Sequence, residues 1–470
     1  MKRMFAATAV ALAFVLPASA NEPRALPNPP APHAPGAPYA PTGLPDRITL
    51  TVGADPARSV GITYRTDTRQ SVGRLELVRA VPGPAQNPER QVFEAETRVL
   101  ETENGVAHHH LFAIDGLEPG TAYSYRVEGA YGWTGWIDFR TAADSDEPFQ
   151  LIYLGDVQNY IGEVGHRVIT QAIRHASNPA VITTAGDFVS QRADMVHDDE
   201  WGQWWDTGAM HYASIAHIPA VGNHEYNPGE MPDGSSVRML GPHWPLQFVL
   251  PENGVPTAQA TSFYSDYQGV RFIVPDVTAV LSLGQMEATT DWIREVASAS
   301  EANWNVVVMH QPLITCARPE NTDLIHDAWL PMFEEVGIHL VLQGHDHCYG
   351  RWSNLDNPRR PGTEPAPQTG PVSIVTVVGG KMYALNDRVA NEADRWGEGT
   401  QFYHLIDFSR DELAYTAWTA QGTLYDAFTL TRRDDGSVWI ADDLASLPPV
   451  RECADEDTGP DGFACTSREK

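Results

Sequence analysis

The chain is organised around one octapeptide, Gly344-His345-Asp346-His347-Cys348-Tyr349-Gly350-Arg351. It comes just after the apolar run His339–Leu342, which predicts a short buried strand. Two imidazoles separated by one residue can face two different ions, and a neutral imidazole nitrogen is a ligand that zinc, iron and manganese accept. Two histidines in a surface turn would give the same pattern, so the other predicted strands must be considered with it.

Four further predicted strands end in residues of the metal-binding type. The strands cover Phe149–Leu154, Ala180–Ala185, Ile218–Val221 and Val306–Met309. The residues that follow them are, in the same order, Asp156 and Gln158, Asp187 and Ser190, Asn223 with His224 and Glu225, and His310. Gly-Asp and Gly-Asn are by themselves common turn dipeptides. Ligands of α/β sheets lie beyond the carboxyl ends of the strands, so five such ends in one chain indicate a metal site.

These residue types suit a pair of metal ions. Two cations about 3.5–4 Å apart need a bridging anionic oxygen, which a carboxylate provides. His, Asn and Asp fill the remaining positions and leave room for a bridging hydroxide. Such a pair holds the phosphoryl oxygens of a substrate and lowers the pKa of bound water, so a nucleophile exists near neutral pH.

Two kinds of pattern divide the body of the chain. Residues 46–142 carry at least six short alternating strands and no helical stretch, which predicts an N-terminal all-β sandwich. Its corner at Gly116–Tyr125 resembles that of fibronectin type III domains. Residues 148–432 alternate buried strands with helices, for example a helix through Val164, Val168 and Ala172. This alternation predicts an α/β domain whose sheet is covered by helices.

The N-terminal end of the chain predicts export, and neither end is expected to contribute to a hydrophobic core. Residues 1–20 have a basic start, the apolar run Met4–Leu16 and an Ala18-Ser19-Ala20 site, which indicates a signal peptide cleaved near Ala20. We therefore expect a secreted or periplasmic protein. Residues 21–45 are rich in Pro and Ala and predict an extended linker, and residues 433–470 predict a C-terminal tail. No apolar run is long enough to span a membrane.

The net charge limits the kinds of partner that this protein can have, and the cysteine content indicates its disulfide bonding. The net charge is −29, with 61 acidic residues against 32 basic ones, of which only Lys2, Lys381 and Lys470 are lysines. This argues against a nucleic-acid partner. The oligomeric state has no signal in the sequence. Four cysteines in an exported chain predict two disulfides, Cys453 with Cys465 in the tail and Cys316 with Cys348 near the metal site. The alternative is a buried free thiol at Cys348.

The order of these motifs resembles the calcineurin-like metallophosphoesterase superfamily, and with the β-sandwich in front it is most similar to the purple acid phosphatases. The resemblance covers residues 46–430. It implies a fibronectin III-like sandwich followed by two packed mixed sheets flanked by helices, with two metal ions of iron, zinc or manganese. It implies that Asp187 bridges the metals, that Asp156 and His347 hold the first ion, and that Asn223, His310 and His345 hold the second. His224 is then the catalytic residue, as a general acid or a stabiliser of the transition state, and Glu225 lies behind the ligands.

Three positions depart from that resemblance. Purple acid phosphatases carry a Tyr three residues after the bridging Asp, whose phenolate gives the colour by charge transfer to ferric iron, and here that residue is Ser190. The wider superfamily places His two residues after the first Asp, and here it is Gln158, whose amide oxygen is a candidate metal ligand. Tyr160 is close in sequence but is not expected to replace the phenolate. The purple family also has Glu where Gly350 stands.

The sequence thus predicts an exported binuclear-metal phosphatase, acid phosphatase-like, that hydrolyses phosphomonoesters of small phosphorylated substrates through a metal-bridged hydroxide. A phosphodiesterase of the same superfamily is the alternative within this chemistry. A catalytically inactive binding or adhesion protein is an alternative of another class, but it predicts eroded ligands. Here every ligand position except the Tyr/His one is filled. The triplet His108–His110 and the cluster Trp201, Trp204 and Trp205 are expected to be structural.

Overall fold

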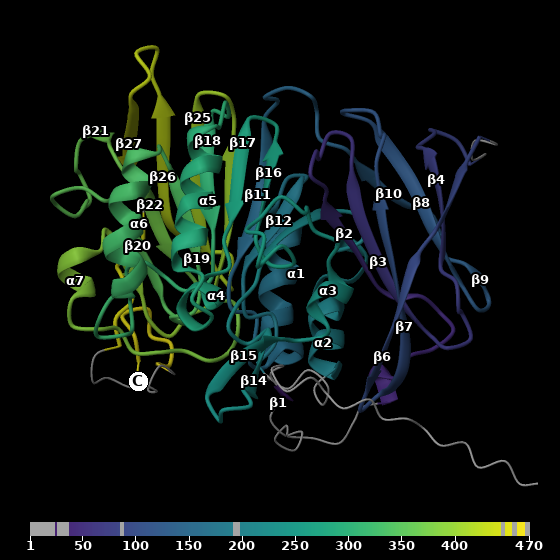
Figure 1. Ribbon diagram of the computed structural model, residues 1–470. Helices are drawn as coiled ribbons and strands as arrows, with labels where there is room; N and C mark the ends of the chain where they lie inside the picture. Colours follow the sequence, from purple (N-terminus) through teal and green to yellow (C-terminus); the bar gives the residue numbers. More distant parts are fainter. Residues whose placement is uncertain are drawn as a thin grey trace, which may run out of the picture.

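The computed structural model describes residues 24–25, 37–84, 89–190, 198–442, 447–453 and 458–465. The predicted signal peptide and most of the predicted linker lie outside these residues. Two large sheets packed face to face, with helices on their outer sides, build the greater part of the molecule (Figure 1). None of the helices in this part of the chain is both long and apolar enough to cross a membrane.

The larger sheet has twelve strands in the order β21-β27-β26-β25-β24-β11-β12-β13-β2-β3-β7-β6. Its centre is parallel, because β11 pairs with β12 and β12 with β13 in that sense, whereas β24 pairs with β11 antiparallel. The bounds in chain order are β2 Asp46–Val52, β3 Val60–Asp67, β6 Glu96–Thr102, β7 Gly105–Ile114, β11 Phe149–Leu154, β12 Val181–Ala185, β13 Ala216–Ala220, β21 Ala366–Gln368, β24 Phe402–Phe408, β25 Glu412–Thr419, β26 Leu424–Arg432 and β27 Val438–Asp442.

The second large sheet has seven strands in the order β16-β17-β18-β19-β22-β20-β23 and is also mixed. Its strands are β16 Phe263–Tyr267, β17 Val270–Val274, β18 Trp304–Val308, β19 Leu340–Gln343, β20 Tyr349–Trp352, β22 Val372–Val375 and β23 Arg395–Gly397. Apolar residues of β11, β12 and β24–β27 pack against those of β17–β19 and β22 in the core between the two sheets. The predicted pair of mixed sheets is confirmed.

Helices cover the outer face of each sheet. They are α1 His166–His175, α2 Asp198–Gly208, α3 Trp244–Gln247, α4 Val277–Ser282, α5 Met286–Ser298, α6 Asp323–Glu335 and α7 Val389–Glu392, with short helical turns at Ile161–Gly165, Ala37–Tyr39 and Ala209–His211. On α1, Val168, Ile169 and Ala172 face Ile152 and Ile182 of the larger sheet. Helices α4, α5 and α6 bury their apolar sides on the seven-stranded sheet.

The N-terminal all-β part is a sandwich, as predicted. Strands β2, β3, β7 and β6 face a five-stranded sheet of β10, β8, β4, β5 and β9 across a core that includes Ile62, Tyr64, Leu75 and Tyr125. The second sheet contains β4 Arg74–Arg79, β5 Gln91–Glu94, β8 Ala122–Gly129, β9 Gly132–Trp133 and β10 Ile137–Arg140. His110 of β7 is buried in the sandwich, where it contacts Thr66 and Thr97, and His109 is buried on the opposite face of the strand, near His243.

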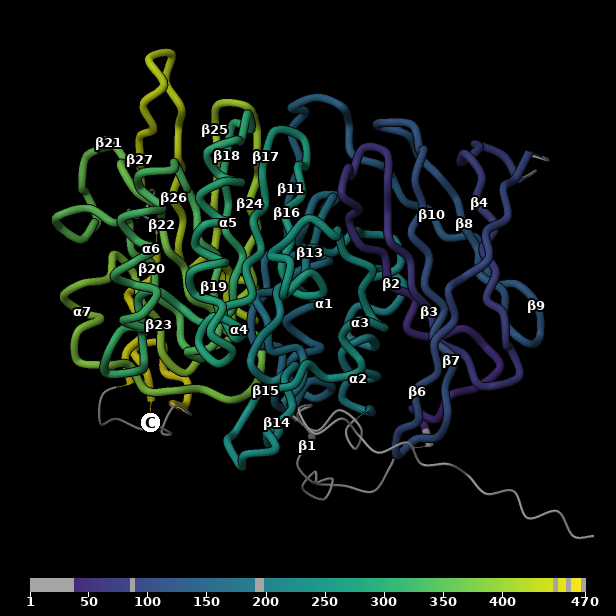
Figure 2. Tube along the Cα trace, viewed as in Figure 1, coloured from purple at the N-terminus to yellow at the C-terminus, as the bar shows by residue number. Residues whose placement is uncertain are grey.

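The sandwich and the α/β part share one sheet, which the sequence did not reveal. Strand β2 pairs in parallel with β13, so the twelve strands run across the molecule from the purple N-terminal strands to the yellow C-terminal ones (Figure 2). Trp205 donates to the carbonyl of Ile48 at 3.0 Å, and Leu50 donates to that of Tyr212 at 2.9 Å. Trp201 and Trp204 are core residues beside this junction, as expected.

Both predicted end segments contain strands. A small sheet joins β1 Arg24–Ala25, from the predicted linker, to β14 Tyr226–Glu230 and β15 Ser236–Leu240. Tyr39 packs on α2 so closely that any side chain at Gly202 would overlap its ring. Strand β27 lies within the predicted C-terminal tail and pairs with β26. Pairing with a neighbouring strand gives these segments an order that their composition does not predict.

Candidate metal centre and active site

The five predicted strand ends meet at one place between the two sheets. Strands β11, β12 and β13 of the larger sheet deliver Asp156, Asp187 and Asn223, and β18 and β19 of the smaller sheet deliver His310 and the His345–His347 pair. Glycines permit the close approach. A side chain at Gly222 would overlap Asp187 Oδ1, and one at Gly344 would overlap Asp156 Oδ2. Side chains from both sheets can therefore face one another directly.

The backbone is strained at four of these residues. Asp156, Asp187, His345 and His347 have φ of 46°, 53°, 74° and 48°, in the left-handed region that side chains other than glycine rarely adopt. Such conformations cost about 1–3 kcal/mol each and persist where the surroundings enforce them, most often at functional sites. The strain turns all four side chains toward a common centre.

Acceptor atoms converge on His310. Its Nε2 lies 3.0 Å from Asp187 Oδ2, 3.1 Å from Asn223 Oδ1 and 3.1 Å from His345 Nδ1. Its Nδ1 is 2.8 Å from the carbonyl of Ala185 and therefore carries the proton of the neutral ring, which leaves a lone pair on Nε2. Burial disfavours the charged ring, but the Asp187 carboxylate outweighs burial and raises the pKa of His310 to about 9, so either a proton on Nε2 or a metal ion can satisfy these acceptors. Asp187, His310 and His345 thus offer a three-ligand set for a metal ion.

A second group of donors lies on the other side of Asp187. His347 Nε2 is 3.3 Å from Asp156 Oδ1, and its Nδ1 donates to the carbonyl of Lys381 at 2.7 Å. Asp156 Oδ1 and Gln158 Oε1 are buried acceptors without a hydrogen-bond donor among the described residues. Buried polar atoms are normally satisfied, so Asp156 Oδ1, which faces His347 Nε2, fits a site that takes a cation. The residues present thus suit two metal ions with Asp187 between them.

Charge and burial shift the acidities of these groups in opposite directions. Burial raises the pKa of Asp156 well above its usual value, and the Asp187 charge adds to this. Asp187 is as deeply buried, but His310 and His224 outweigh burial and hold its pKa well below the usual range. Burial lowers the pKa of His347 to about 4. The centre therefore contains at least one carboxylate and one neutral imidazole that are ready to bind a metal.

Glu225 fixes the loops behind the ligands, as the resemblance implied. Its carboxylate accepts the backbone N–H groups of Asp187 at 3.0 Å, Phe188 at 2.8 Å and Gly222 at 2.6 Å. Burial, with the Asp187 charge, raises the pKa of Glu225 to about 7. One side chain thus joins the loops that follow β12 and β13.

His224 lies at the rim. Its Nδ1 donates to the carbonyl of Ser190, its Nε2 is 3.9 Å from Asp187 Oδ2, and 22% of its side chain is exposed. The backbone N–H of His224 donates to Asp187 Oδ1 at 2.8 Å, so the ring keeps a fixed position relative to that carboxylate. His224 is therefore placed to meet a substrate that approaches from solvent.

Two family models match the chain. The purple acid phosphatase N-terminal domain matches residues 45–141, and the calcineurin-like phosphoesterase model matches residues 149–349. Residues 149–349 belong to the calcineurin-like phosphoesterase family. The predicted family is confirmed.

Several known proteins are similar to this chain. Purple acid phosphatase 23 of Arabidopsis thaliana is 22% identical over 356 residues, which cover 66% of this chain and 70% of the plant protein. Purple acid phosphatase 17 of the same plant is 23% identical over 249 residues, which cover 47% and 68%. An uncharacterized protein of Mycobacterium tuberculosis is 27% identical over 342 residues, or 64% of this chain, and the match spans only 61% of that protein's length. The solved structure of PhoD has the same fold, with a TM-score of 0.57 at 10% identity over 87% of this chain and 93% of PhoD.

The positions that depart from the resemblance have distinct surroundings in the structure. Gln158 donates through Nε2 to Asp187 Oδ2 at 2.8 Å, so its amide nitrogen and not its oxygen faces the bridging position. Ser190 donates through Oγ to Glu200 at 2.6 Å. Tyr160 is 64% exposed. A side chain at Gly350 would overlap the Trp352 ring, so this position has no room for a Glu unless the tryptophan moves.

Sequence reasoning missed a sixth loop at the site. After β22, the N–H of Gly379 donates to the carbonyl of Asp156 at 2.7 Å, and Lys381 provides the carbonyl that accepts from His347. The Tyr383 ring lies on the His347 ring with centroids 4.8 Å apart. The sequence signal was Gly379-Gly380 after an apolar strand, but no residue of the metal-binding type follows it.

Both predicted disulfides are present, Cys316–Cys348 and Cys453–Cys465. The first joins the loop after His310 to the His345–His347 loop. Arg318, on the same loop as Cys316, donates to the carbonyl of His345 at 3.2 Å and pairs with the buried Asp346. The two site loops are therefore held together by a covalent bond and an ion pair.

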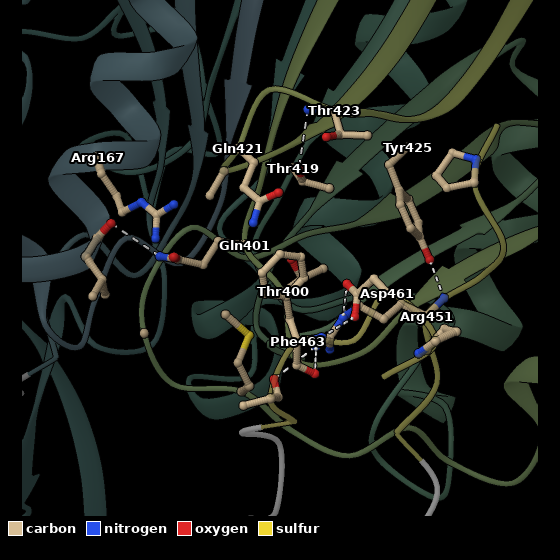
Figure 3. Close-up of a pocket in the computed structure, with 18 of the residues that line it drawn as sticks. Arg167, Thr400, Gln401, Thr419, Gln421, Thr423, Tyr425, Arg451, Asp461 and Phe463 are labelled. Atoms are coloured by element: carbon tan, nitrogen blue, oxygen red, sulfur yellow. Dashed lines mark hydrogen bonds and ion pairs between the residues drawn. The ribbon is translucent and has the colours of Figure 1, made fainter. Parts of the chain in front are cut away.

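A cavity of about 590 Å³ lies between α1, the turn before β26 and the Cys453–Cys465 segment (Figure 3). Gly380 and Met382 line it, and Arg451 in its wall donates to Asp461 at 2.8 Å. Of the described residues that line this cavity, none is a candidate ligand. It is separate from the metal centre.

Proposed function

We propose that this protein is an exported, binuclear-metal phosphatase that hydrolyses phosphomonoesters in the manner of an acid phosphatase. One observation carries the proposal. Five strand ends from two sheets bring the Asp156 carboxylate, an asparagine and three imidazoles together around Asp187, with His224 beside them at the open rim. When bound, the two ions polarise the phosphoryl oxygens and lower the pKa of water.

Two ligand groups would hold the ions. Asp156 and His347, with Gln158 as a further candidate, would hold the first, and Asn223, His310 and His345 would hold the second. Asp187 would bridge both, since its Oδ2 lies near His310 on one side and Gln158 on the other. The carbonyls of Ala185 and Lys381 hold the Nδ1 protons of the neutral His310 and His347 rings, so each Nε2 carries a lone pair. The lone pair of His347 accepts from Gln158 Nε2 at 3.1 Å and would exchange this contact for a metal ion.

His224 would act on the leaving group. Because its Nδ1–H is held by the Ser190 carbonyl, its Nε2 points past Asp187 toward solvent. In the imidazolium form it can protonate the leaving-group oxygen as the P–O bond breaks, a contribution of about 10²–10⁴ in rate for a positioned general acid.

Export is supported by the two disulfides, which persist in oxidising compartments.

Metal content and ester preference test the proposal together. Protein purified from its native compartment should contain about two metal ions per chain and hydrolyse 4-nitrophenyl phosphate at least about tenfold faster than the bis-ester. A chelator should remove both metal and turnover. Faster turnover of the bis-ester would make the protein a phosphodiesterase. Bound metal without turnover of either ester would favour an inactive binding protein.

A further inference from the structure

A second cavity, of about 620 Å³, lies beside the candidate metal centre. Its walls are the segments 317–319 and 381–388, and its lining includes Arg318, Lys381 and Arg388. Three basic residues and one acidic residue, Asp387, line this cavity, so its lining carries an excess of basic residues in a chain whose net charge is −29. Lys381 is also the only one of the chain's three lysines that lies among the described residues. We call this cavity the Lys381 pocket.

The Lys381 pocket shares a wall with the ligand loop. The Tyr383 ring that lines it lies on His347, and the Lys381 carbonyl accepts from the same imidazole. On the opposite wall Arg318 donates to the His345 carbonyl at 3.2 Å. A substrate whose phosphate sits at the metal centre would therefore extend its leaving group toward this pocket.

The pocket combines an aromatic face with positive charge. Lys381 Nζ lies 5.2 Å from the centroid of the Tyr383 ring, and Arg318 Cζ lies 5.8 Å from it. Ala317, Pro319 and Leu385 add apolar surface. Arg388 is held by the Pro319 carbonyl at 3.1 Å and by Asn321 at 3.0 Å, so it supports the wall. Arg318 and Lys381 are the cations nearest the Tyr383 face.

We propose that the Lys381 pocket binds a second anionic group of the substrate, carried on an aromatic or apolar leaving group. The substrate class is an organic phosphomonoester that also bears a carboxylate or another phosphate. This rests on the proposed function, because the scissile phosphate must occupy the metal centre. An ammonium with a mobile stem suits a carboxylate or phosphate, and the Tyr383 face suits a ring between the two anionic ends.

The test compares two aryl phosphates that differ by one charge, phenyl phosphate and 4-carboxyphenyl phosphate. The metal-loaded wild type should favour the carboxylated ester about tenfold in kcat/KM, the range of one charge-assisted hydrogen bond. Lys381→Met should remove most of this preference, and Lys381→Arg should keep most of it. Both variants retain the backbone carbonyl that holds His347. Arg410→Met is the matched control, since it removes one positive charge from a 72% exposed side chain away from the site.

Binding of non-hydrolysable analogues separates this proposal from the proposed function. Calorimetry with benzylphosphonate and 4-carboxybenzylphosphonate needs no turnover, and the carboxylated analogue should bind about tenfold more tightly to the wild type and to Arg410→Met, but not to Lys381→Met. That result without hydrolysis of any ester would support the pocket and contradict the phosphatase. Hydrolysis of both esters with no carboxylate preference, or a preference that Lys381→Met leaves intact, would overturn the pocket.

Discussion

At the scale of single residues, alanine variants of Asp187 and His224 should lose activity for different reasons. Asp187 Oδ2 lies between His310 and Gln158, so Asp187→Ala removes the one carboxylate shared by both ligand groups. We expect this variant to lose both metals and all turnover. His224→Ala leaves the ligands in place and should keep the metals while the rate falls by about 10²–10⁴-fold. Elemental analysis with ester turnover checks both, and an active, metal-loaded Asp187→Ala protein would contradict the bridging assignment.

Colour is a second property set by single residues. The iron-loaded protein should lack a broad visible band, because Ser190 is bonded to Glu200 and Tyr160 is exposed. Tyr383, whose ring lies on His347, is the one tyrosine shown in ring contact with a candidate ligand among the described residues. An absorption spectrum decides the matter. Ser190→Tyr should gain the band if the position is correctly matched, and a wild-type band that disappears in Tyr383→Phe would contradict the expectation.

At the scale of elements, the Cys316–Cys348 bridge should affect both stability and activity. It closes a sequence separation of 32 residues, against 12 for Cys453–Cys465. Chain entropy gives about 3–4 kcal/mol for the longer loop. The double variant Cys316→Ala/Cys348→Ala should lose about that much free energy of unfolding. Its kcat/KM should also fall, because the loops of Arg318 and His345 are no longer joined. The double variant Cys453→Ala/Cys465→Ala is the control and should retain full kcat/KM.

The elements that the sequence predicted well are those with strong apolar patterns. Strand β11 has the predicted bounds, and the other four ligand-bearing strands lie within two residues of theirs. Their candidate ligands could be identified from the sequence because each follows a buried strand closely. Strand β6 was missed because its exposed and charged residues show no clear alternation. Lys381, Tyr383 and Arg318 were missed for another reason, since only tertiary contacts with His345 and His347 bring them to the site.

At the scale of the whole molecule, the sandwich and the α/β part should unfold together. The shared sheet is reinforced by a buried cluster around Asp198 at the start of α2. Its carboxylate accepts from Arg47 at 2.6 and 2.9 Å, from Arg65 at 3.1 Å and from His243 at 2.8 Å. Both arginines belong to strands of the sandwich, and all three partners are buried. One carboxylate therefore neutralises charges from both parts of the fold.

Asp198→Ala should lower the free energy of unfolding by about 3–5 kcal/mol, because it leaves buried guanidinium groups without that partner. Arg47 is affected most, since Arg65 keeps Asp46 at 2.7 Å. Urea denaturation followed by tryptophan fluorescence should show one transition at a lower midpoint. Asp144→Ala removes the same charge from an exposed pair with Arg58 and should change stability by no more than about 0.5 kcal/mol. If Asp198→Ala instead splits the curve into two transitions and shifts only the first, the sandwich unfolds independently and the continuous sheet does not couple the two parts.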